Sequence, residues 1–217
     1  QQMGEFFRTI RPEVEKGAKV HVAPSFSQRF EIMPLTASIY IDYYKDGIAA
    51  GIQFRYEGVS FNPVTLKENP QGSNGRVLIR DALTERQILR YFRQYQFEPQ
   101  KDQLVQADEE KSYDFLTEAL PELSQIADVY YSEVFHKKPV QAMAKVTAGV
   151  SVNDMNLLEV SLKNQDFDFD ELLDILASYR LKRRYHRLED GTFVTLGEQQ
   201  LGALADFVES AGIEKTG

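Results

Sequence analysis

The sequence of 217 residues contains no cysteine and only three histidines, His21, His136 and His186. The lack of cysteine excludes disulfides, thiolate zinc ligands and a cysteine nucleophile, and the histidines do not have the spacing of metal ligands. No stretch approaches the ~18 consecutive apolar residues of a membrane span, and no basic-then-apolar leader opens the chain. We therefore expect a cytoplasmic protein with no membrane contact, no cofactor and no metal site.

Motifs of ATP and serine hydrolase chemistry are missing as well. The sequence has no Gly-x-x-x-x-Gly-Lys followed by Ser or Thr, so it offers no cradle for the phosphates of ATP. It also has no Gly-x-Ser-x-Gly elbow for a serine nucleophile. The tetrapeptide Asp108–Lys111 is similar to the acidic magnesium-binding motif of helicases. Without a phosphate loop it indicates the start of a helix instead.

One acidic series remains as a candidate for metal binding. It consists of Asp166, Asp168, Asp170, Glu171 and Asp174. Carboxylates bind divalent cations, but this spacing lacks the glycine and the twelfth-position glutamate of a calcium loop. We expect the series to form the capped start of a helix. A metal-dependent nuclease that uses these carboxylates stays open as a less favoured alternative.

Positive charge is concentrated in one place. The formal net charge is -8, yet five of the eight residues Arg180–Arg187 are lysine or arginine, so the rest of the chain carries -13. We call Arg180–Arg187 the basic segment, and cations at this density can neutralise phosphates or bind acidic partners. The predicted contact residues are Arg180, Lys182, Arg183, Arg184, Tyr185, His186 and Arg187.

Two interpretations of the basic segment are open. If Lys182–Leu188 is a strand, alternate side chains face opposite ways and no single face holds all the charge. The cations either contact phosphate or a partner, or they cover the acidic series and the C-terminal end of their own helix, where the dipole favours positive charge. His186 either makes binding depend on pH, because five neighbouring cations favour its neutral form, or is a surface histidine without a role.

An internal duplication is indicated by Phe6–Val14, which aligns without gaps with Phe115–Leu123 at an offset of 109 residues. Each copy predicts a helix, a Pro-Glu turn and then a strand. The repeat halves are about residues 1–100 and 101–217. Because strands of one half can pair with those of the other, we predict a single domain over residues 1–217.

Each half contains a predicted hairpin. Alternating residues in Ile39–Tyr44 and Ile52–Tyr56 flank Asp46-Gly47, a pair that favours the turn twist of a hairpin. The counterpart runs through Val146–Val152 and Leu157–Leu162. These strands, with packed helices, predict an α+β fold with a mainly antiparallel sheet, built from two tandem related repeats.

Three helices are predicted from their ends. The first begins at a capping box in Thr84–Gln87, the second is capped by Asp168 with Glu171, and the third ends at Gly212. Their apolar stripes are Ile88, Leu89 and Phe92; Leu172, Leu173, Leu176 and Tyr179; and Leu201, Leu204, Phe207 and Val208. The second helix leads directly into the basic segment.

Two stretches have no regular period. Lys67–Gly75 combines proline, glycine and asparagine with nothing apolar to pack, which predicts a loop. A second, weaker break at Glu98–Asp108 separates the two halves. We expect Lys67–Gly75 to be a mobile insertion between strands.

The stretch Ser178–Val194, with the sequence SYRLKRRYHRLEDGTFV, resembles the signature of the bacterial Swi/Snf-family helicase-associated domain. The similarity extends over roughly residues 5–200 and includes Ala37–Tyr56, Leu78–Asp81 and Glu110–Pro121. It is a similarity of pattern, and no catalytic residue is transferred with it.

The resemblance implies a position inside a larger protein. In that family the domain lies between an N-terminal zinc-binding module and an ATP-driven motor that translocates on double-stranded DNA. This chain has neither the cysteines of the first nor the phosphate loop of the second, so it is expected to be a non-catalytic fragment of an ATP-dependent helicase. The implied partners are the downstream Swi/Snf motor lobes of the same polypeptide and double-stranded DNA. A structural spacer or protein-interaction platform is the alternative.

Overall fold

The computed structural model describes residues 10–21, 30–66, 77–133, 139–143, 145–152, 154 and 158–213. It divides into two compact units, Gln1–Val134 and Phe135–Gly217, which we call unit 1 and unit 2. Both units mix helices with strands, which confirms the predicted α+β class. The single domain and the tandem repeats stay predictions. No helix in the described ranges has the length and apolar character needed to cross a membrane.

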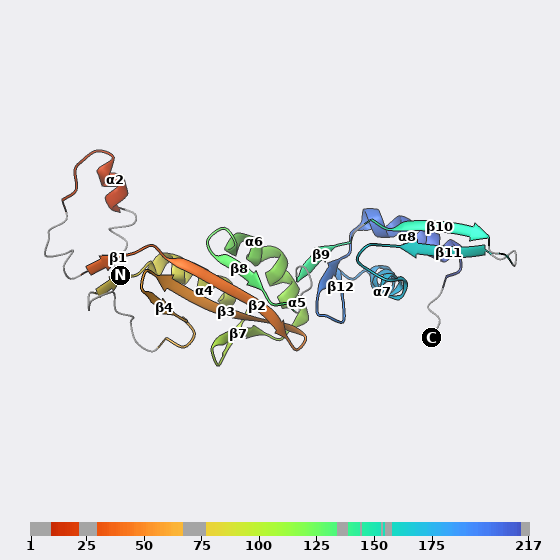
Figure 1. Ribbon diagram of the computed structural model, residues 1–217, viewed down its shortest axis with the longest axis horizontal. Helices are drawn as coiled ribbons and strands as arrows, with labels where there is room; N and C mark the ends of the chain where they lie inside the picture. The colour runs from red at the N-terminus through yellow and green to blue at the C-terminus, as the bar shows by residue number, and fades with distance from the viewer. Residues whose placement is uncertain are drawn as a thin grey trace. The chain divides into compact units, whose positions relative to one another are not determined.

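Unit 1 is organised around a six-stranded sheet with the order β6-β7-β3-β2-β8, in which β4 also pairs with β3. Its strands are β2 (Thr36–Tyr44), β3 (Gly47–Tyr56), β4 (Val59–Phe61), β6 (Glu98–Gln100), β7 (Gln103–Gln106) and β8 (Asp128–Tyr131). The long hairpin β2–β3 forms its centre (Figure 1). Strand β8, from the predicted second half, runs parallel to β2 and so joins the sheet of the first half.

The turn of the β2–β3 hairpin differs from the prediction. Tyr44 pairs with Gly47, so the central turn residues are Lys45 and Asp46, and Lys45 has a φ of 50°. Gly47 is instead the first residue of β3, where a Cβ atom would lie 1.9 Å from the backbone oxygen of Gln106. The glycine is therefore required by the close approach of β7 and not by the turn.

Four helical elements of unit 1 bury residues in a core with the sheet. They are α4 (Ala82–Gln94), α5 (Glu109–Asp114), the π-helical turn η3 (Phe115–Ala119) and α6 (Leu120–Leu123), whereas the short α2 (Arg11–Glu15) exposes Val14. Strand β3 buries Ile52 and Phe54. Helix α4 buries Ile88 and Phe92 as its apolar stripe predicts, and the Phe92 ring lies 5.1 Å from that of Phe115. Packing of these apolar side chains is the main stabilising term of the unit.

The predicted start of α4 was wrong. Its N-cap is Asp81, whose carboxylate accepts a hydrogen bond from the backbone N–H of Thr84 at 3.2 Å. Thr84 itself lies in the first turn, and its hydroxyl donates to Asp81. An aspartate caps at least as well as a threonine and also complements the helix dipole, so the N-cap lies three residues earlier than predicted.

Two further predictions in unit 1 need correction. The weak break at Glu98–Asp108 contains the antiparallel hairpin β6–β7, whose two-residue turn is opened by Lys101 at a φ of 55°. Proline is tolerated in β6 because this is an edge strand. The predicted turn at Pro121 is helical, because the helix continues through a π turn in which Leu120 N–H donates to the Phe115 carbonyl. The loop predicted at Lys67–Gly75 lies outside the described residues.

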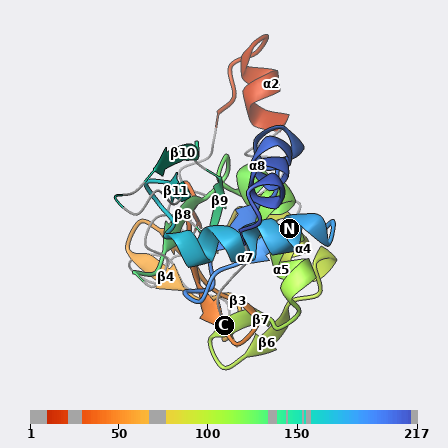
Figure 2. The same cartoon turned by 90° about the vertical axis from the view of Figure 1, so that its right-hand side faces the viewer.

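The described residues of unit 2 form two small sheets and two helices. Its elements are β9 (Val140–Ala142), β10 (Thr147–Val152), β11 (Leu158–Lys163), α7 (Phe169–Arg180), β12 (Tyr185–Arg187), β13 (Phe193–Thr195) and α8 (Glu198–Ser210). The predicted hairpin is confirmed as the antiparallel pair β10–β11, and β12, β13 and β9 form a three-stranded sheet. Helix α8 crosses α7 (Figure 2).

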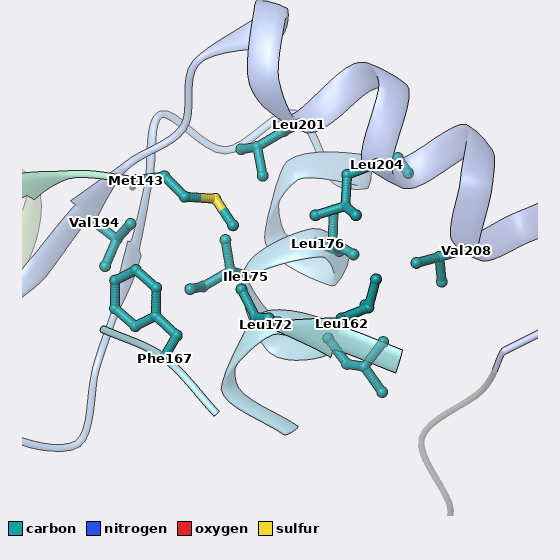
Figure 3. Packing of buried hydrophobic residues seen from close by; sticks show 12 residues of the cluster. Met143, Leu162, Phe167, Leu172, Ile175, Leu176, Val194, Leu201, Leu204 and Val208 are labelled. Atoms are coloured by element: carbon teal, nitrogen blue, oxygen red, sulfur yellow. The ribbon is translucent and has the colours of Figure 1, made fainter. Parts of the chain in front are cut away.

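The core of unit 2 lies between these helices and the strands beside them. Leu172, Ile175 and Leu176 of α7 point toward Leu201 and Leu204 of α8 (Figure 3). All five side chains are buried. The apolar stripes predicted for α7 and α8 therefore pack against each other. This packing holds α7 in place and so positions its C-terminal end.

A similar strand arrangement occurs in both units. In unit 1, β1 (Phe30–Ile32) runs parallel to β5 (Val77–Ile79), which leads into α4. In unit 2, β9 runs parallel to β13, which leads into α8. In each unit a hairpin lies in sequence between the two parallel strands.

Candidate nucleic-acid interface

Helix α7 positions the basic segment. Asp168 and Glu171 form the predicted capping box, with the Asp168 carboxylate accepting from Glu171 N–H at 2.9 Å and the Glu171 carboxylate accepting from Asp168 N–H at 3.0 Å. The buried stripe then anchors the helix to the core. Arg180 is its last residue, so the basic segment begins where a well-packed helix ends.

The helix ends in a Schellman cap, in which the two N–H groups after the last turn bond back to its carbonyls. Lys182 N–H donates to the Tyr179 carbonyl at 2.8 Å, and Arg183 N–H donates to the Ser178 carbonyl at 3.2 Å. Lys182 has a φ of 56°. For a residue with a Cβ atom this left-handed conformation costs about 1–2 kcal/mol, so glycine is the usual choice.

The strand considered over Lys182–Leu188 is therefore shorter in the structure. Only Tyr185–Arg187 pairs as β12, because Lys182 and Arg183 are used to cap α7. We call Leu181–Arg184 the cap turn. Its side chains are exposed, with Leu181 at 68 %.

The three residues of β12 are half-buried and contact the fold itself. The Tyr185 ring packs edge-on against Phe193 at 5.1 Å, and the Arg187 guanidinium lies 5.1 Å from the centre of the same ring. His186 points the other way, where its Nδ1 is 2.8 Å from the Ser178 hydroxyl. The predicted alternation of faces is thus observed within β12.

The structure divides the predicted contact residues into two groups. Lys182, Arg183 and Arg184 are exposed on the cap turn, whereas Tyr185, His186 and Arg187 contact the buried part of unit 2. Arg180 is exposed at the end of α7, and its guanidinium donates to the Ala205 carbonyl of α8 at a long 3.4 Å. The basic segment thus contains both residues exposed to solvent and residues that pack within unit 2.

The acidic series shows no metal geometry. Asp168 and Glu171 cap the helix, and Asp166 N–H donates to Asn164 in the turn before it. Across the described ranges, no three histidine, aspartate or glutamate side chains gather closely enough to hold a metal ion. The described residues therefore give the nuclease alternative no metal site.

The Asp108–Lys111 motif is a helix start, as predicted, because Asp108 accepts from Lys111 N–H.

A polar pocket lies at the base of the β10–β11 hairpin and was not predicted. Its volume is about 370 Å³, and its lining residues are Lys145, Thr147, Lys163, Asn164 and Gln165. The pairing of Thr147 with Lys163 brings the two lysines to the same end of the hairpin. The hairpin was predicted, but its strand pattern does not show that these five side chains enclose a pocket.

A buried polar network in unit 1 was also missed. Tyr56, which is fully buried, donates from its hydroxyl to Glu85 at 2.5 Å. Arg80 pairs with the same carboxylate at 2.5 Å, and Asp81 N–H donates to the Tyr56 hydroxyl at 2.7 Å. These bonds tie the start of α4 to strand β3 and satisfy a glutamate that is only 5 % exposed.

The pKa values of Tyr91, Tyr95 and Tyr131 in unit 1 are raised. Burial and the hydrogen bond to Glu118 raise the pKa of Tyr95 to about 12. The hydrogen bond to Glu122 raises the pKa of Tyr91, and burial raises that of Tyr131. In each case the neutral phenol is favoured over the phenolate.

The fold and the surface define a mixed helix-and-sheet protein that presents a cationic turn at the end of a packed helix. The model of the bacterial SNF2 helicase associated family matches residues 1–216. The chain therefore belongs to that family, as the resemblance of Ser178–Val194 implied. No curated protein and no solved structure matches it significantly. The family description identifies it as a helicase-associated domain.

Proposed function

We propose that this chain is a non-catalytic accessory domain of a SNF2-type helicase that contacts the backbone of double-stranded DNA through the cap turn. The observation that carries the proposal is the exposure of Lys182, Arg183 and Arg184 together on one turn of a chain with a net charge of -8. Clustered exposed cations in an acidic protein favour a local phosphate contact over general nucleic-acid binding.

The proposal includes the surroundings of the chain. We place it in the cytoplasm within a longer polypeptide whose motor lobes hydrolyse ATP and follow it in sequence. These lobes are the second candidate partner of the cap turn. The exposed Leu181 supports this candidate, because a protein partner would cover an apolar side chain that a phosphate contact leaves in water.

We also propose that the two predicted repeats are two copies of one structural unit that was duplicated. The support is the order shared by β1, the β2–β3 hairpin, β5 and α4 with β9, the β10–β11 hairpin, β13 and α8. In this scheme α7 and β12 are an addition to the second copy. The addition brings the basic segment.

The test is a titration of the purified chain onto a short labelled DNA duplex at low and at physiological salt. We expect weak, salt-sensitive binding by the wild type and its loss in the triple variant Lys182→Glu, Arg183→Glu, Arg184→Glu. A matched control is Arg86→Glu, Arg90→Glu, Arg93→Glu, which reverses three exposed cations of α4 and should retain binding.

The outcomes separate the alternatives. Equal loss in both triple variants would show general electrostatics instead of a site, and absence of wild-type binding at low salt would move the contact to the motor lobes. Unfolding of the cap-turn triple, measured by thermal melting, would favour the structural spacer. Cleavage of DNA in magnesium or manganese would favour the nuclease.

A further inference from the structure

Three helices of the described ranges end in the same Schellman cap, with a left-handed residue at the same position. These residues are Gln96 after α4, Lys182 after α7 and Gly212 after α8, with φ values of 58°, 56° and 64°. The following N–H donates back over five residues each time, from Phe97 to Phe92, from Arg183 to Ser178 and from Ile213 to Val208. The three caps can therefore be compared position by position.

Two of the caps have local compensation. After α4, the Phe97 ring packs edge-on against Phe92 at 5.2 Å, and the Gln96 side chain accepts a hydrogen bond from Lys111 at 2.8 Å. After α8, glycine removes the backbone strain and Ile213 packs against the core of unit 2. In a Schellman cap, the residue that follows the left-handed position typically makes an apolar contact with the helix residue five positions before it.

The cap of α7 has neither form of compensation. Lys182 stands where glycine would be unstrained, and the exposed Arg183 occupies the position of the apolar residue. Within the described part of the chain, neither side chain makes a hydrogen bond or an ion pair. Backbone strain without a local gain is a feature of functional positions.

We infer that the α7 cap is a phosphate-binding turn, in which Lys182 and Arg183 each contact one phosphate of duplex DNA; this rests on the proposed function and deepens it. The N–H groups of both residues are used by the cap, so the contact is made by side chains alone. Such a contact positions a duplex without reading its sequence. Two adjacent exposed cations match the charge of neighbouring phosphates on a duplex, which favours DNA over a protein partner.

The competing explanation is that Lys182 stabilises its own helix. A cation near a helix C-terminus interacts favourably with the dipole, whereas a lysine in the left-handed conformation is strained relative to glycine. Lys182→Gly therefore distinguishes the two. Relief of strain raises the melting temperature, and loss of a dipole contact lowers it.

The experiment measures melting and DNA binding of the full chain for wild type and Lys182→Gly. We expect the melting temperature to rise or stay unchanged, while the affinity for a short duplex at low salt falls several-fold. The logarithm of the affinity decreases with the logarithm of the salt concentration. The magnitude of this negative slope should decrease by about 0.9, the value for one lost phosphate contact. Arg183→Leu, which restores an apolar residue at its position, should reduce the slope by a similar amount.

A charge-matched control moves the lysine to the other cap. The double variant Lys182→Gly, Gly212→Lys keeps the net charge and places a lysine in the same motif after α8. We expect it to bind DNA no better than Lys182→Gly. Recovery of wild-type affinity in this variant would overturn the assignment of the site to α7.

Other outcomes also overturn the inference. An unchanged salt slope in Lys182→Gly, or a lower melting temperature, would assign Lys182 to the stability of its own helix. If the triple variant Lys182→Glu, Arg183→Glu, Arg184→Glu loses DNA binding but Lys182→Gly retains it, the inference fails while the proposed function stands. If the wild type does not bind duplex at low salt, both fail.

Discussion

The hairpins β2–β3 and β10–β11 have similar strand patterns and very different surroundings. Strand β3 also pairs with β4 and β7, and β2 with β8, so the first hairpin lies inside a sheet. The second is a two-stranded sheet on its own. Ile39 and Ile52 are 0 % and 2 % exposed, whereas Val150 and Val152 are 56 % and 61 % exposed.

The difference shows that alternation determines pairing but not burial. In the second hairpin, Leu162 near the base is still buried in the core of unit 2. Val150 and Val152, farther from that core along β10, are exposed because no described element covers them. A residue pattern can form a hairpin from its own turn and strands, but only neighbouring elements can bury its face.

The largest effect is expected from Glu85→Ala in unit 1. Removing this carboxylate leaves the buried Tyr56 hydroxyl and the partly buried Arg80 guanidinium without their partner. We expect a loss of about 3 kcal/mol in the free energy of unfolding, measured by urea denaturation. Ser178→Ala, which removes one hydrogen bond to His186 in unit 2, should cost about 1 kcal/mol. Equal costs would contradict the comparison.

The glycines of the two hairpins should respond differently to alanine. In Gly47→Ala the new Cβ would lie 1.9 Å from the backbone oxygen of Gln106, so β7 must move. In Gly149→Ala it would lie 2.9 Å from the Ser161 hydroxyl, which can rotate away. We expect losses of about 2–3 kcal/mol and under about 1 kcal/mol respectively. A tolerated Gly47→Ala, judged by the midpoint of urea unfolding, would refute the close approach of β7.

A smaller effect is expected from alkaline pH through Tyr95. Its pKa is raised from 10.0 to about 12, so the folded state holds the proton more tightly than the unfolded state. The resulting stability is complete below pH 10 and is lost as the pH rises toward 12. Tyr95→Phe should therefore lose less stability than wild type over this window. Parallel pH profiles of the two proteins in urea denaturation would contradict the assignment.

The smallest effect is expected from Val150→Thr in β10. The side chain is 56 % exposed, and threonine keeps the branched shape that strands favour. We expect a change within about 0.5 kcal/mol in urea denaturation. A loss above about 1 kcal/mol would show that this face of the hairpin is covered in solution.

Local features were predictable from the sequence. The Asp168–Glu171 capping box, the apolar stripe of α7 and the end of α8 at Gly212 depend on residues within a few positions of each other. The β10–β11 hairpin also lies close to its predicted bounds. Each of these patterns has one dominant local interpretation.

The failures depend on distant partners. Thr84–Gln87 matches a capping box, yet the cap of α4 is Asp81, whose N–H donates to the hydroxyl of Tyr56, a residue 25 positions away in the sequence. Gly47 matches a turn glycine, yet its reason is the Gln106 carbonyl, which is remote in sequence. At the candidate site, the charge of the basic segment was visible, but its division into the cap turn and β12 required the positive φ of Lys182. A lysine at a position that favours glycine gives no sequence signal.

The parallel pairing of β8 with β2 has a practical consequence for expressing pieces of this protein. A chain cut between the predicted halves, near residue 100, would lose β7 and β8 and leave an edge of the long β2–β3 hairpin bare on each side. Bare edges of this kind recruit other chains and lead to aggregation. A cut between Val134 and Phe135, where the two compact units meet in sequence, would keep every pairing of the six-stranded sheet within one piece.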